Sequence, residues 1–159
     1  MKYIIITGGV LSGIGKGITW ASIGALLKSA GHKVRMQKLD GYLNIDASQI
    51  NPQHHGESFV THDGAVTDLD IGHYERFIER DLGQDSSYTM GRIYQEILTQ
   101  ERQGYFEGRD VQMIPHVSDL ILSKIKNWLS QSGADIAIIE IGWTVWDIEN
   151  EILIEATRE

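Results

Sequence analysis

The hydrophobic residues of this chain occur in runs that alternate between strand-like and helix-like spacing. Residues 2–7 (KYIIIT) form an apolar run rich in β-branched residues, which is typical of a strand buried on both faces. A helical pattern over residues 16–28 follows and stops at Gly31, and a second apolar run covers residues 33–39. A strand, a helix and a strand at this spacing predict two parallel strands joined by a crossover helix.

The rest of the chain continues this alternation, apart from an irregular part at residues 40–67. That part is rich in glycine, asparagine and aspartate, but loops of such length in compact domains are usually functional, and its apolar residues argue against disorder. Further strands are predicted at 57–61, 110–114 and 135–141, and further helices at 69–80, 92–103, 118–130 and from about 147 onward. These elements predict one three-layer α/β domain over residues 1–159, with a mainly parallel sheet.

Composition narrows the range of partners and chemistries. The chain has 159 residues, of which 42% are hydrophobic and 23% charged, as is usual for soluble globular proteins. Its formal net charge of -8 repels nucleic-acid phosphates and anionic membranes, so we expect neither as a partner. The absence of cysteine excludes disulfides, thiolate metal sites and cysteine nucleophiles. No segment resembles a membrane span or a signal peptide, so a cytoplasmic location is expected.

A glycine-rich segment, residues 7–17 (TGGVLSGIGKG), joins the first predicted strand to the first predicted helix. Backbone N–H groups and a helix N-terminus bind phosphates at such a junction, and Lys16 can reach the terminal phosphates. The strict P-loop motif is not met, because Val10 stands where its first glycine belongs and Gly17 where its hydroxyl residue belongs. A glycine-rich turn with an exposed lysine is the alternative, but the position between strand and helix favours phosphate binding in a P-loop NTPase-like (Rossmann-like) domain.

The missing hydroxyl at Gly17 removes one expected magnesium ligand, because P-loop enzymes use the side chain at that position to coordinate the ion. Two acids stand where they could replace it. Glu140 ends an apolar strand at the sheet edge where α/β proteins bind ligands, and Asp70 follows Asp68 at the start of a helix. Helix capping for the aspartates and a paired strand-end acid for Glu140 remain open as alternatives. The six histidines show no metal-ligand spacing, which disfavours a zinc site.

At this point the chain resembles one family, CTP synthase, in its N-terminal synthetase (amidoligase) domain. The matching segments run in order over the whole chain: TGGVLSGIGKG, KLDGYLNID, NPQHHGESFVTHDGAVTDLDIGHYERF, GRIYQEILTQERQGYFEG, VQMIPHVSD and EIGWTVWDIEN. This family makes CTP from UTP: ATP phosphorylates O4 of uracil, and ammonia then displaces the phosphate. A separate glutaminase domain supplies the ammonia.

The resemblance implies roles for the matching residues. The ATP phosphates are held by the glycine loop, here Gly13, Ile14, Gly15, Lys16, Gly17 and Ile18, and Asp70 also belongs to the ATP-binding residues. Asp70 and Glu140 bind Mg²⁺, while Lys16 and Lys38 act on the transferring phosphoryl group. The pyrimidine nucleotide is contacted by Ser12, Asp147, Ile148 and Glu149. The implied ligands are thus Mg²⁺, ATP, UTP and CTP, and the family's tetramers imply a homo-oligomer.

Two departures from the family pattern affect this expectation. Trp143 and Trp146 replace glycines beside the nucleotide segment, and a tryptophan costs stability wherever the backbone needs a positive φ. The family's later UTP-binding segment and its glutaminase domain are not among these 159 residues. We therefore expect a synthetase portion that is weak or inactive alone and that exposes an apolar surface or an unpaired strand edge, which favours association.

Two other functional classes are weighed against this reading. The first is a non-catalytic nucleotide-binding or regulatory relic of the same fold, in which the tryptophans block the UTP site. The second is another P-loop ligase or a partitioning ATPase of the dethiobiotin-synthetase type, which the segments DLDIGHYERF and IPH disfavour.

Overall fold

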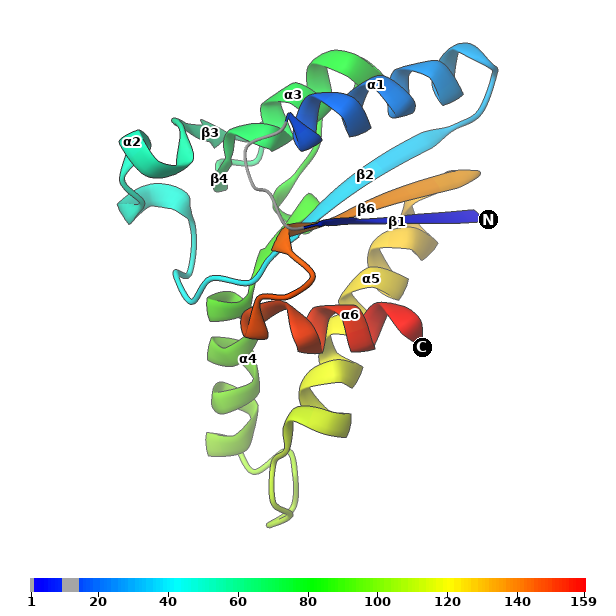
Figure 1. Ribbon diagram of the computed structural model, residues 1–159. Coiled ribbons are helices and arrows are strands. Elements are labelled where there is room, and N and C mark those ends of the chain that lie inside the picture. Colours follow the sequence, from blue (N-terminus) through cyan, green and yellow to red (C-terminus); the bar gives the residue numbers. More distant parts are fainter. Residues whose placement is uncertain (1, 10–14) are drawn as a thin grey trace.

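The computed structural model describes residues 2–9 and 15–159. Four of its described strands form a fully parallel sheet in the order β1-β6-β2-β5. The strands are β1 (Lys2–Gly8), β6 (Ile136–Thr144), β2 (Val34–Asp40) and β5 (Ser87–Thr89). Because β6 lies between β1 and β2, the two strands joined by the first crossover helix are parallel but not adjacent (Figure 1).

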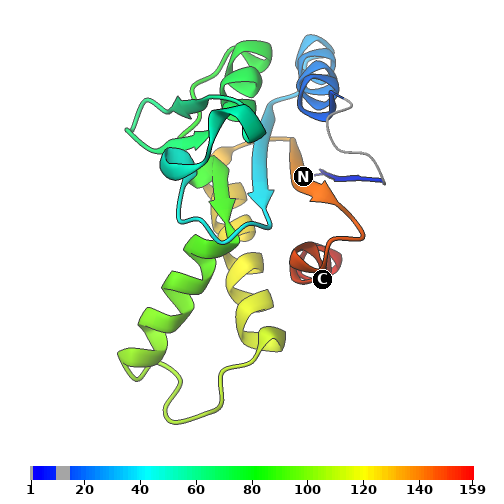
Figure 2. The same cartoon turned by 60° about the vertical axis from the view of Figure 1, so that its left-hand side comes forward.

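Helices cover both faces of this sheet, so the predicted three-layer α/β architecture is confirmed (Figures 1 and 2). One face carries α1 (Lys16–Ser29) and α3 (Leu69–Ile78), and the other carries α4 (Met90–Arg102), α5 (Ser118–Ser132) and α6 (Glu151–Arg158). A short helix, α2 (Pro52–His55), and an antiparallel hairpin of β3 (Ser58–Val60) and β4 (Val66–Asp68) lie in the segment predicted to be irregular. None of the helices in the described part has the length and apolarity that a membrane span requires.

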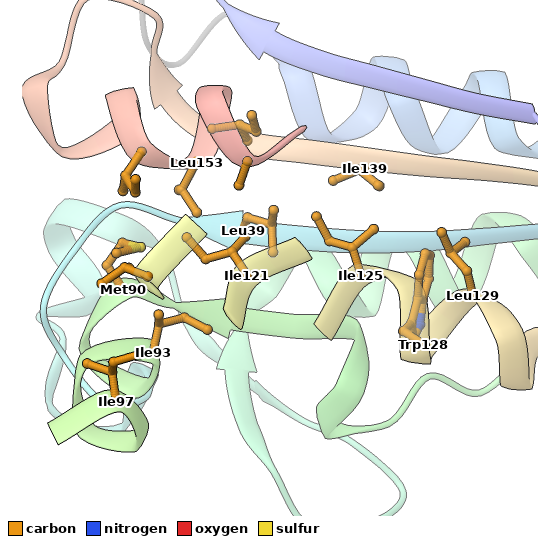
Figure 3. Packing of buried hydrophobic residues seen from close by; sticks show 14 of the residues in the cluster. Leu39, Met90, Ile93, Ile97, Ile121, Ile125, Trp128, Leu129, Ile139 and Leu153 are labelled. Carbon is orange, nitrogen blue, oxygen red and sulfur yellow. The ribbon is translucent and has the colours of Figure 1, made fainter. Parts of the chain in front are cut away.

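The side chains of β6 alternate between the two cores. Ile136 and Ile138 pack against α1 and α3, whereas Ile139 and Ile141 pack with α4, α5 and α6, as Figure 3 shows around Ile139. This double burial explains why the strand is apolar at consecutive positions. The same alternation places Glu140 on the α1–α3 face, at the carboxyl end of the strand.

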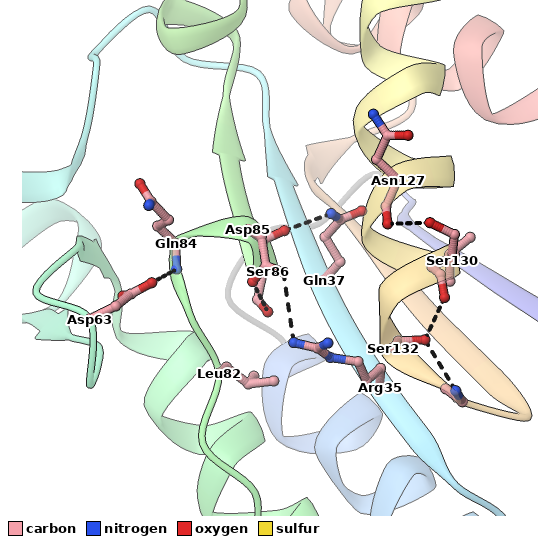
Figure 4. A network of polar contacts seen from close by, with 12 residues as sticks. Arg35, Gln37, Asp63, Leu82, Gln84, Asp85, Ser86, Asn127, Ser130 and Ser132 are labelled. Atoms are coloured by element: carbon pink, nitrogen blue, oxygen red, sulfur yellow. Dashed lines mark hydrogen bonds and ion pairs between the residues drawn. The ribbon is translucent and has the colours of Figure 1, made fainter.

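A buried polar contact attaches the short strand β5 to β2. Gln37 of β2 donates its Nε2 to the Asp85 carbonyl at 2.8 Å, and the Arg35 guanidinium lies 3.8 Å from the Asp85 carboxylate (Figure 4). Asp85 belongs to a 3₁₀ turn, η2 (Gln84–Ser86), which directly precedes β5. These contacts fix the entry of β5 into the sheet.

The prediction of a strand at residues 110–114 is wrong. Its last residues belong to a π-helical turn, η3 (Met113–Val117), which runs into α5. Met113 and Ile114 are exposed, and no described strand lies beside them to pair with. The final helix begins at Glu151 rather than near 147, after a short 3₁₀ turn, η4 (Ile148–Asn150).

β1 is an edge strand of the sheet in the described part of the chain, because it is paired only with β6. Tyr3 and Ile5, on one face of this edge strand, are 54% and 41% exposed. They border a groove formed with α5 and α6 that has a volume of about 270 Å³. An unpaired, apolar strand edge is a template for pairing with another chain.

We therefore expect this chain to self-associate in solution through β1. Ile5→Lys places a charge on the edge strand and should weaken the association at least tenfold, or about 1.4 kcal/mol. The control is Leu98→Lys, which makes the same change at an exposed leucine of α4. Sedimentation velocity measures both, and equal effects of the two variants would show that β1 is not the contact.

Candidate functional site

The carboxyl ends of β6 and β2 meet the first turns of α1 and α3 at a cavity of about 670 Å³. This is the sheet edge at which parallel α/β proteins bind ligands. Most of the residues predicted for the site line this cavity together, namely Gly15, Lys16, Gly17, Ile18, Lys38, Asp70, Glu140 and Asp147. The structure thus brings together residues that are up to about 130 positions apart in the sequence.

The other five predicted residues are not among the described residues that line this cavity. Ser12, Gly13 and Ile14 fall outside the described residues. Ile148 and Glu149 line a second cavity of about 610 Å³, which also includes Leu43 and Tyr94.

The chain after β2 forms a wall between these two cavities. Asp40 and Tyr42 line the first cavity, while Gly41 and Leu43 line the second. Gly41 is needed in this wall, because a Cβ atom there would lie 2.6 Å from the Asn150 side-chain oxygen. A ligand that crosses this wall would contact residues of both cavities.

Lys38 lies at the centre of the charged groups in the first cavity. Its ammonium is 2.5 Å from Asp70 Oδ2, 3.2 Å from Asp68 Oδ1 and 3.7 Å from Asp40 Oδ1. Only 7% of the Lys38 side chain is exposed. Lys38 and Glu140 are neighbours across the β2–β6 pair, so strand register positions the lysine next to a further carboxylate.

Burial and these neighbours change the proton affinities of the cluster. Burial favours neutral Lys38, but Asp40, Asp68 and Asp70 outweigh it and keep the pKa of Lys38 well above its usual value. Burial raises the pKa of Asp40 to about 7, although Lys38 acts in the opposite direction. Burial also raises the pKa of Asp70, but the neighbouring Lys38 lowers it by more, so the pKa of Asp70 lies below its usual value. The lysine is therefore charged, and Asp70 is the carboxylate that it holds ionised.

Glu140 is held by a residue that the sequence did not single out. The buried Tyr74 hydroxyl of α3 donates a hydrogen bond to Glu140 Oε2. Burial raises the pKa of Glu140, while Lys38 and this hydrogen bond lower it. Tyr74 fixes the orientation of the carboxylate, and only the packing of α3 on β6 reveals the pair.

Gly17 has a structural reason to lack a side chain. A Cβ atom at this position would overlap the Asp70 carboxylate, which lies against the backbone of the first turn of α1. The carboxylate therefore occupies the space that a serine or threonine side chain would fill in the usual P-loop. Asp68 caps α3, since its Oδ1 accepts a hydrogen bond from the Asp70 N–H at 2.9 Å, so the capping interpretation is confirmed for Asp68.

Asp70 and Glu140 suit magnesium, which binds to few protein carboxylates and takes its other ligands from phosphates and water. Among the side chains that the structure describes, there is no group of three or more acidic or histidine residues that could hold a metal by itself. A metal at this cavity would therefore need ligands from a bound phosphate as well. The carboxylate that displaces the P-loop hydroxyl is chemically fit to take over its role.

The second lysine of the cavity, Lys16, is bound to the backbone. Its ammonium donates to the Trp143 carbonyl at 2.5 Å. Trp143 has a φ of 64°, a left-handed conformation that costs a non-glycine residue about 1–2 kcal/mol. The expected strain is thus present at Trp143. Trp146 is 79% exposed and is not among the described residues that line the cavity.

The turn after β6 is held by its own hydrogen bonds. Asn150 donates its Nδ2 to the carbonyls of Gly142 and Thr144, at 2.7 and 2.8 Å. Asp147 accepts a hydrogen bond from the Thr144 N–H at 2.7 Å. One oxygen of Asp147 is therefore engaged within the turn, although the residue lines the cavity.

Comparison with known proteins identifies relatives over the full length of this chain. The family model described as CTP synthase N-terminus matches residues 2–159. A CTP synthase of Methanosarcina mazei is 52% identical over 159 residues, which are 100% of this chain and 30% of the relative. CTP synthases of Mycoplasma capricolum and Sulfurisphaera tokodaii are each 54% identical over 158 residues, or 99% of this chain and 30% of each relative.

The chain thus spans about 30% of the length of the curated relatives that it matches. The match with the family model covers almost every residue, including all described residues of the cavity. The chain belongs to the CTP synthase N-terminal family.

Proposed function

We propose that this chain is the ATP- and UTP-binding portion of a synthetase that aminates UTP to CTP in pyrimidine nucleotide biosynthesis. The observation that carries the proposal is the meeting of Lys16, Lys38, Asp70 and Glu140 around one cavity, in a chain of the CTP synthase family. On this proposal, residues 1–159 are part of one synthetase-type domain. The ammonia comes from a glutaminase outside these residues or from solution.

Each group of the cavity has a role in phosphoryl transfer. Lys16, at the start of α1, neutralises the terminal phosphates of ATP, and the first turn of α1 offers its N–H groups to them. Asp70 and Glu140 would hold Mg²⁺, which neutralises phosphate charge and orients the reacting group when it is bound. Lys38 stabilises the charge on the phosphoryl group during transfer. Tyr74 keeps Glu140 oriented toward the cavity.

The two cavities and the wall between them suit a pyrimidine nucleotide. Asp147 lines the first cavity, while Ile148 and Glu149 line the second, so a nucleotide that contacts all three spans both. In the reaction, ATP transfers its γ-phosphoryl group to O4 of UTP and leaves as ADP. Ammonia then attacks C4, phosphate leaves and a proton is lost, which yields CTP.

A non-catalytic nucleotide-binding protein of the same fold is the second candidate. Two observations favour it: the strained Trp143 stands at the cavity, and Asp147 is engaged within its own turn. Such a protein would bind ATP without turning it over. ATP binding and CTP formation therefore have to be measured separately.

The first experiment tests the phosphate-binding role of Lys16. Lys16→Ala should weaken ATP binding at least tenfold, because it removes the ammonium that pairs with terminal phosphates, while the unfolding midpoint stays nearly unchanged. Isothermal titration calorimetry measures the affinity. The control is Lys28→Ala, at the other end of α1, which removes an exposed ion pair with Glu79 and should leave ATP affinity unchanged. Equal ATP affinities in wild type and Lys16→Ala would refute the assignment.

A second experiment tests the metal ligands. Asp70→Asn and Glu140→Gln should each abolish most of the increase in ATP affinity that Mg²⁺ produces, because Gly17 offers no hydroxyl in their place. Asp119→Asn, at an exposed acid in the first turn of α5, is the matched control. If Mg²⁺ still strengthens ATP binding equally in all three variants, these carboxylates do not hold the ion.

The third experiment separates the two candidate functions. Supplied with ATP, UTP, Mg²⁺ and ammonium, this chain alone should form CTP no faster than its Lys16→Ala variant, because it spans about 30% of its relatives. ATP should still bind, since the described part of the glycine loop and the carboxylates are in place. CTP formation is followed by absorbance. Sustained turnover above the variant would make this chain a synthetase by itself.

A further inference from the structure

In the described part of the first cavity, both lysines already have partners within the protein. The Lys38 ammonium lies 2.5 Å from Asp70 Oδ2, and the Lys16 ammonium donates to the Trp143 carbonyl at 2.5 Å. Asp70, a proposed metal ligand, is thus engaged by a buried cation. Lys38 thus compensates part of the negative charge of the cluster from inside the protein. Asp70 and Glu140 are not a free carboxylate pair, because Lys38 contacts one and the Tyr74 hydroxyl the other.

This arrangement creates a conflict between a metal ion and Lys38. A divalent ion at Asp70 would lie within a few ångström of an ammonium that contacts the same carboxylate, and like charges repel strongly in a partly dry site. Moving Lys38 away without a replacement cation would leave Asp68 and Asp70 uncompensated, which is also costly. Metal and ammonium therefore exclude each other unless a new anion attracts the lysine.

A nucleotide phosphate is such an anion, and Lys38 lines the cavity that would receive it. We propose that Lys38 is the cation that occupies the metal site in the absence of nucleotide. It exchanges Asp70 for a phosphate group when Mg²⁺ and nucleotide enter together, so that free Mg²⁺ alone binds poorly. The proposal rests on the proposed function in one respect, namely that Asp70 is a metal ligand.

The test measures metal binding to the nucleotide-free protein, with Mn²⁺ as the probe and electron paramagnetic resonance as the readout. Wild type should bind Mn²⁺ weakly, with no saturable site below millimolar concentrations. Lys38→Met removes the cation from the carboxylates but keeps an unbranched side chain. This variant should bind one Mn²⁺ at least tenfold more tightly than wild type. Adding Asp70→Asn to this variant should remove the gain, which locates the ion.

Two controls isolate the effect of the buried charge. Lys38→Arg keeps the cation and should bind Mn²⁺ as weakly as wild type. Lys124→Met removes an ammonium that lies 2.6 Å from Glu96 on the opposite face of the sheet, and should also leave Mn²⁺ affinity unchanged. A gain in Lys124→Met would show that the effect is one of total charge, and a gain in Lys38→Arg would show that loss of the buried cation is not its cause. Either result would overturn the proposal.

Lys38→Met leaves buried carboxylates without their cation and can fold poorly without metal. In that case its unfolding midpoint should rise with added Mn²⁺ by several degrees more than that of wild type. Equal Mn²⁺ affinities and equal midpoint shifts in wild type and Lys38→Met would overturn the exchange. Tight Mn²⁺ binding by nucleotide-free wild type would overturn it as well.

These outcomes differ from a failure of the proposed function. If Lys16→Ala leaves ATP affinity unchanged, the nucleotide site is wrong irrespective of the behaviour of Lys38. If ATP and Mg²⁺ bind cooperatively but Lys38→Met gains no Mn²⁺ affinity, only the exchange is wrong. In wild type, the exchange requires that ATP raises Mn²⁺ affinity, and by linkage Mn²⁺ then raises ATP affinity by the same factor.

Discussion

Burial of β6 on both faces is the constraint from which the candidate site follows. The strand is paired with β1 and β2 and covered by helices, so its charged residue at position 140 cannot turn to water without leaving the sheet. A buried carboxylate needs partners. The protein supplies them through geometry: strand register brings Lys38 beside Glu140, and α3 contributes the Tyr74 hydroxyl. Buried strand positions that would otherwise belong to the hydrophobic core thus carry charged side chains that line a cavity.

Most parts of the fold that were predictable from sequence have long, regular patterns. The strand at residues 135–141 and the helices near 16–28 and 118–130 have enough residues for periodicity to show. β4 and β5 have three residues each and exist because hydrogen bonds to neighbouring segments hold them. The run at 110–114 has strand-like composition, but a strand needs a neighbour, and none of the described strands is available there.

The same distinction applies to the site. Lys16 and Gly17 begin a regular helix and Glu140 lies in a regular strand. Their residue types and positions therefore indicated their chemistry from the sequence alone. The pairing of Lys38 with Asp40, Asp68 and Asp70, and of Tyr74 with Glu140, arises from strand register and from the packing of α3. Such contacts depend on three-dimensional distances between segments, which spacing along the chain does not encode. The sequence predicted strain at Trp143 only if its φ is positive, and the value of φ is known only from the folded backbone.

The overlap between Gly17 and Asp70 has an evolutionary consequence. A hydroxyl side chain at 17 and the present position of the carboxylate at 70 exclude each other, because a Cβ atom at 17 would occupy the space of the carboxylate. A lineage that uses one solution cannot acquire the other through a single substitution at 17 without first displacing the carboxylate at 70. The two positions form an epistatic pair, and if Asp70 is a metal ligand, as proposed, a glycine that looks like a lost motif residue marks a separate and mutationally isolated way to hold the same ion.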